Sequence, residues 1–93
     1  MTYSHIYNIT QIRKRQGGVR MILGENELKI FGARVEAARK KKGLTQEELA
    51  DKAGVSQSMI NHIEKGRKKP SLDIAIAIAR EFNTTVDALI SRV

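Results

Sequence analysis

Five polar residues between positions 57 and 65 are spaced so that a helix would carry them on one arc. They offer amide, hydroxyl, imidazole and ammonium groups, and none of them is acidic. Groups of this kind suit the edges of nucleic-acid bases and the phosphates beside them. The simpler alternative is a solvated face of a small helical domain, although such faces usually mix both signs of charge. The candidates for base contact are Gln57, Ser58, Asn61, His62 and Lys65.

The elements that must position these residues are two short helices, each with its own start signal. Thr45 is a suitable N-cap, and Glu48 three residues later completes a capping box. Ser56 is placed to cap the second helix. Gly54 between the helices and Gly66 after the second one can take the positive φ of a helix-ending turn. This order of signals predicts a helix-turn-helix.

With these signals, residues 30–91 resemble the lambda-repressor-like, Cro-type DNA-binding domain, also called the xenobiotic-response-element family. The resemblance covers about two-thirds of the chain. It implies an all-α fold of five helices over residues 30–93, with the second and third helices forming the DNA-reading unit. The segments that carry the resemblance are 44–50, 54–56, Ile60, 63–66, 70–72 and 86–90.

The resemblance also implies roles for single residues. Gln57, Ser58 and His62 match positions that face bases, whereas Asn61 and Lys65 could touch either base or phosphate. Gln46 matches a position that contacts the DNA backbone and braces the first reading residue, Gln57. Two further matches, Arg39 and Glu64, imply an ion pair that ties the first helix to the end of the reading helix.

Contacts to the DNA backbone are expected on both sides of the reading helix. Thr45 can cap its helix while leaving backbone amides aimed at a phosphate. Three cations, Arg67, Lys68 and Lys69, follow the reading helix directly and are well placed to neutralise phosphates. The alternative for these three is an ordinary exposed basic loop.

The composition restricts the partners. The chain has 93 residues and a formal charge of +7, which favours a polyanion, with double-stranded DNA first and an anionic membrane surface second. There is no cysteine, no metal-ligand spacing and no nucleotide-binding glycine motif, and the histidines lie in separate segments. No apolar run is long enough to span a membrane. We therefore expect a cytoplasmic protein that is not an enzyme and needs no metal or cofactor.

The other helices follow from apolar patterns. A helix is expected from Ile30 to Gly43, whose αL conformation would end it. Pro70 and Ser71 start a helix that is apolar nearly all round between residues 72 and 82, so we expect it to be largely buried. A short final helix, capped by Thr85, is expected over about 86–91.

Residues 1–29 form an N-terminal extension outside the resemblance. The preferred interpretation is a β-hairpin of roughly residues 3–12 and 19–23, which would pack on the domain or pair with a second subunit. The basic residues 13–15 are either an arm that touches DNA or a solubilising hairpin tip.

The function predicted from these features is that of a dimeric repressor that binds a roughly palindromic operator through the major groove. The alternative is a DNA-binding antitoxin whose residues 1–29 bind a protein toxin. A transcriptional activator with the same domain is a third reading, because the fold does not decide between them.

Overall fold

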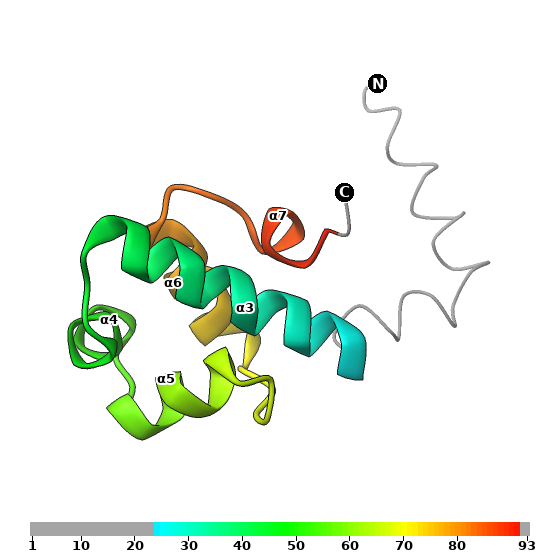
Figure 1. Cartoon of the computed structure of the whole chain (residues 1–93), viewed down its shortest axis with the longest axis horizontal. Helices are drawn as coiled ribbons and strands as arrows, with labels where there is room; N and C mark the ends of the chain where they lie inside the picture. Colours follow the sequence, from blue (N-terminus) through cyan, green and yellow to red (C-terminus); the bar gives the residue numbers. More distant parts are fainter. Residues whose placement is uncertain (1–23, 92–93) are drawn as a thin grey trace.

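Helix α3 (Glu25–Lys42) runs through the middle of the domain, with α5 on one side of it and α7 on the other (Figure 1). The computed structural model describes residues 24–91, and every regular element in that range is a helix, which confirms the all-α prediction there. Helix α4 contacts both α5 and α6. The four shorter helices are α4 (Gln46–Ala53), α5 (Gln57–Glu64), α6 (Leu72–Glu81) and α7 (Val86–Ile90).

The starts of α4 and α5 are set by the predicted capping side chains. The Thr45 hydroxyl accepts a hydrogen bond from the Glu48 amide at 3.0 Å, and the Glu48 carboxylate accepts one from the Thr45 amide at 2.8 Å. Two amides that the helix leaves without partners are satisfied in this way. The Ser56 hydroxyl accepts from the Met59 amide at 3.1 Å. Both helix starts are therefore confirmed where the sequence predicted them.

The same two helices end at glycines in the left-handed conformation, with φ of 74° at Gly54 and 70° at Gly66. In each turn the amide one residue beyond the glycine donates to a carbonyl of the last helical turn, at 3.0 Å after α4 and 2.9 Å after α5. This Schellman arrangement satisfies carbonyls that would otherwise lack partners. The short turn between α4 and α5 is thereby fixed, and with it the angle between the helices.

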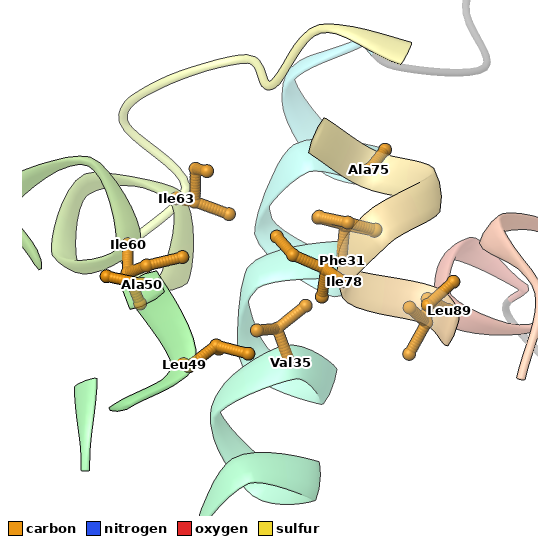
Figure 2. Packing of buried hydrophobic residues seen from close by; sticks show 10 residues of the cluster. Phe31, Val35, Leu49, Ala50, Ile60, Ile63, Ala75, Ile78 and Leu89 are labelled. Atoms are coloured by element: carbon orange, nitrogen blue, oxygen red, sulfur yellow. The ribbon is translucent and has the colours of Figure 1, made fainter. Parts of the chain in front are cut away.

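All five helices contribute to one apolar core (Figure 2). In α5 the inward side chains are Ile60 and Ile63, and Figure 2 shows Ile63 pointing towards α3. Because these two residues share one face of α5, the opposite arc of that helix is left for solvent. The buried members of the core are Phe31, Val35, Leu49, Ala50, Ile60, Ile63, Ala75, Ile78, Ala79 and Leu89.

Two expectations from the sequence need correction. Helix α3 begins at Glu25 rather than Ile30, because Gly24 starts it without the side-chain cap that would have marked the position. Leu72, expected to be buried, is 69% exposed. It is the first residue of α6 and lies one turn before Ala75, where burial begins. The predicted hairpin and the basic residues 13–15 lie outside the described residues.

Candidate nucleic-acid interface

Helix α5, together with the residue that follows it, Lys65, carries the five candidates for base contact on the side opposite the core, and this set is called the polar arc below. Gln57, Ser58 and Lys65 are exposed, and Asn61 and His62 are half-buried. The structure therefore brings the five candidates for base contact together on one continuous surface. A helix with its polar side chains outside and its apolar ones in the core is suited to lie in the major groove of duplex DNA.

The single carboxylate of α5, that of Glu64, is buried and paired with Arg39 of α3. Arg39 Nε donates to Glu64 Oε2 at 2.7 Å and Nη2 donates to Oε1 at 3.2 Å, a two-pronged contact. Arg39 Nη1 also donates to the Leu44 carbonyl at 2.8 Å, so it holds the turn before α4 as well. The hydrogen bond to Glu64 raises the pKa of Arg39 above its ordinary value. The pair ties α3 to the last turn of α5 and keeps a negative charge off the outer surface.

Gln46, the first residue of α4, lies close to the same carboxylate. Its Nε2 donates to Glu64 Oε1 at 3.0 Å and to Asn61 Oδ1 at 3.2 Å. The sequence led us to expect that Gln46 would brace Gln57. In this structure the amide nitrogen of Gln46 is turned instead towards the end of α5, where the carboxylate attracts it, so the bracing of Gln57 stays a prediction. The residue that Gln46 holds is Asn61.

Gly32 was not identified from the sequence, yet it determines how closely α3 approaches α5. A Cβ at this position would lie 2.3 Å from the Ile63 carbonyl oxygen and 2.6 Å from that of Glu64. No side chain fits there, because both obstacles are backbone atoms. The signal that could have revealed the site is a glycine inside a helix, where it costs about 1 kcal/mol relative to alanine and so calls for a packing reason.

The candidates for phosphate contact lie at both borders of the arc. Thr45 and Gln46 stand at the start of α4, which the bond from Gln46 to Asn61 places beside α5. The loop after α5 carries three exposed cations with no ion-pair partner among residues 24–91: Arg67, Lys68 and Lys69. The arc is therefore bordered by positive charge that is free to neutralise phosphates.

Other kinds of site find little support in this part of the chain. Between residues 24 and 91 there is no cluster of His, Cys, Asp or Glu side chains that could hold a metal ion. No helix in that range is long and apolar enough to cross a membrane. A cavity of about 390 Å³ lies between the ends of α3 and α6, against Ala38, Lys42 and Phe82, and no residue of α5 lines it.

Two capped helices around a short turn, with the second one presenting donor groups outward, define a helix-turn-helix domain. The chain belongs to the helix-turn-helix family, since residues 35–89 match the family model HTH_3, described as helix-turn-helix. This match begins inside α3 and extends into α7, and so it includes the whole of α4 and α5.

Similar proteins are known in sequence and in structure. An uncharacterized HTH-type transcriptional regulator from Archaeoglobus fulgidus is 48% identical over 56 residues, which are 60% of this chain and 80% of that protein. The immunity repressor protein of Bacillus phage phi105 is 41% identical over 59 residues, or 63% of this chain and 41% of the repressor. The restriction-modification controller protein C.AhdI from Aeromonas hydrophila superimposes with a TM-score of 0.62 at 32% identity, covering 67% of this chain and 94% of that one.

Proposed function

We propose that this protein is a sequence-specific DNA-binding regulator of transcription, and that it acts as a repressor. Helix α5 would lie in the major groove, with α4 crossing the backbone above it. The observation that carries this proposal is the outward, carboxylate-free arc of α5, bordered by three cations that have no ion-pair partner between residues 24 and 91. The regulators to which the chain is similar support it, and the phage immunity repressor among them favours repression.

The roles of the arc residues follow from the groups that they carry. Gln57 can form a bidentate pair with adenine, and His62 or Lys65 can donate to guanine acceptors. Ser58 can contact any base edge, because its hydroxyl both donates and accepts. Backbone amides at the start of α4 and the cations after α5 would fix the register on the duplex without reading its sequence.

We further propose that two copies bind together on a roughly palindromic operator, with half-sites about one helical turn apart. A single domain of this size buries only about 600–1,000 Å² on DNA, which supplies little discrimination alone. Residues 1–29 would contribute to the dimer or to a contact with another protein. Since the bound partner is DNA, the place of action would be the cytoplasm.

The test is an anisotropy titration on duplex DNA from upstream of the protein's own gene, beside a scrambled duplex of equal length, at several salt concentrations. Tight, saturable binding of two chains to the native duplex alone is expected. Equal binding to both duplexes that collapses with salt would refute sequence-specific recognition. Co-purification of a small protein that depends on residues 1–29 would instead favour the antitoxin alternative.

Two single substitutions distinguish residues that recognise bases from residues that neutralise phosphates. Gln57→Ala should reduce the binding free energy by about 1–3 kcal/mol on the native duplex and by almost nothing on the scrambled one. Lys68→Ala should weaken binding to both duplexes by a similar factor. It should also reduce the slope of log affinity against log salt concentration by about 1. If the two variants behave alike on both duplexes, the assigned roles are wrong.

A further inference from the structure

A line of hydrogen bonds connects the buried interior to the outer arc of α5. Arg39 donates to Glu64 at 2.7 Å, and the amide nitrogen of Gln46 donates to the same carboxylate at 3.0 Å. That nitrogen also donates to Asn61 Oδ1 at 3.2 Å. Asn61 is half-buried and belongs to the arc, whereas Glu64 is only 6% exposed.

The direction of these bonds follows from the carboxylate. An ionised carboxylate only accepts hydrogen bonds, so the atom of Gln46 that faces Glu64 must be its nitrogen. The second hydrogen on this nitrogen points at Asn61, which must therefore turn its oxygen inward. The two ends of an amide have nearly the same shape, so the buried charge, rather than packing, decides which way both amides are turned.

We propose that this arrangement makes Asn61 a hydrogen-bond donor towards DNA. This inference rests on the proposed function. Its oxygen is turned to Gln46, and its Nδ2 has no partner among residues 24–91. An unconstrained asparagine reads adenine by accepting from N6 and donating to N7 at once. Because Oδ1 of Asn61 faces Gln46 rather than the groove, Asn61 cannot complete that pair and presents only donors. It should therefore favour guanine, whose N7 and O6 both accept, or thymine O4, over adenine, whose N7 lies beside the N6 donor; a phosphate oxygen is the other acceptor available to it.

The direction of the bonds can be tested without DNA, from proton exchange of the Gln46 side-chain amide measured by NMR. Asn61→Asp keeps an acceptor towards Gln46, so the amide protons should stay as protected as in the wild type or become more so. Asn61→Ala removes the acceptor, and protection should fall. Loss of protection in Asn61→Asp would show that Asn61 points its nitrogen inward, which overturns the inference.

The consequence for recognition is tested with the upstream duplex and a set of its single-base-pair variants. Comparing the wild type with Asn61→Ala locates the position that Asn61 contacts, and guanine or thymine should be preferred there. Gln46→Met frees Asn61 to rotate, and discrimination against adenine at that position should fall about 2- to 10-fold. The control is Gln57→Ala, whose loss of discrimination should lie at a different position and be unaffected by Gln46→Met.

The two sources of acceptor give different results. If Asn61→Ala weakens binding to every duplex variant equally, and Asn61→Asp weakens binding further through charge repulsion, the acceptor is a phosphate. A wild-type preference for adenine or cytosine at the Asn61 position would refute the inference while leaving the proposed function intact, as would unchanged discrimination in Gln46→Met. Failure of the wild type to distinguish the native duplex from the scrambled one refutes the proposed function itself.

Discussion

Replacing Gly32 with alanine should push α3 away from the end of α5. The new methyl group would lie 2.3 Å from the Ile63 carbonyl oxygen, whereas contact begins near 3.4 Å. The helices would have to separate by about 1 Å at this point, because backbone carbonyls cannot rotate aside as a side chain can. The ion pair between Arg39 and Glu64 spans the same contact and would be stretched as well.

Two effects of opposite sign determine how much Gly32→Ala changes the free energy of unfolding. Alanine is the better helix former by about 1 kcal/mol, which would stabilise α3. Overpacking a well-packed contact costs typically about 1–3 kcal/mol and occasionally more, and rigid obstacles place Gly32 at the upper end of that range. We expect a net loss of about 2 kcal/mol, which lowers the melting temperature of a domain of this size by roughly 10 °C.

The assay is urea unfolding followed by circular dichroism, with Ala33→Gly as the matched control. Ala33 is the exposed neighbour in α3, so this substitution removes one methyl group with no packing change and should cost about 1 kcal/mol from helix propensity alone. If Gly32→Ala is more stable than the wild type by a similar amount, the close approach of α3 and α5 does not restrict that position, and the reasoning fails.

Three further predictions concern named contacts, each measured from the urea midpoint. Glu64→Ala should lower the free energy of unfolding by about 3–5 kcal/mol, because it leaves Arg39 charged and buried. Adding Arg39→Met should recover part of that loss. Additive effects of the two substitutions would contradict this coupling. Thr45→Ala removes the capping box and should cost about 1 kcal/mol, so an unchanged midpoint would show that the cap contributes nothing. Lys42 lowers the pKa of Glu81 below its ordinary value of 4.5, chiefly through a 2.8 Å hydrogen bond. The resulting stabilisation is present above pH 4.5 and is lost as the pH falls through the lowered pKa. Lys42→Met should therefore flatten the pH dependence of stability below pH 4.5, and an unchanged dependence would count against the pair.

The features that the sequence predicted well are those fixed by neighbouring residues. Helix caps and helix-ending turns depend on residues within one helical turn, so they can be recognised in the sequence, as at Thr45, Ser56, Gly54 and Gly66. The polar arc of α5 is equally local, since the helical repeat alone separates it from Ile60 and Ile63.

The features that the sequence did not predict depend on distances between elements. The close approach at Gly32 is set by the separation of α3 from α5, and the partner of Gln46 by where α5 ends relative to α4. The start of α3 was placed too late because Gly24 offers no side-chain cap. The Arg39–Glu64 pair was expected only through resemblance, since 25 positions separate the two residues in the chain.

The residues of the arc differ in how firmly they are joined to the rest of the molecule. Gln57, Ser58 and His62 make no side-chain hydrogen bond or ion pair with any residue between 24 and 91, whereas Asn61 is tied to the interior through Gln46. The first three can therefore be exchanged at little cost in folding free energy, so the DNA sequence that is recognised can change while the scaffold stays the same. A change at Asn61 also alters the hydrogen bonding of Gln46 inside the domain, so this is the position of the arc at which recognition and scaffold have to be redesigned together.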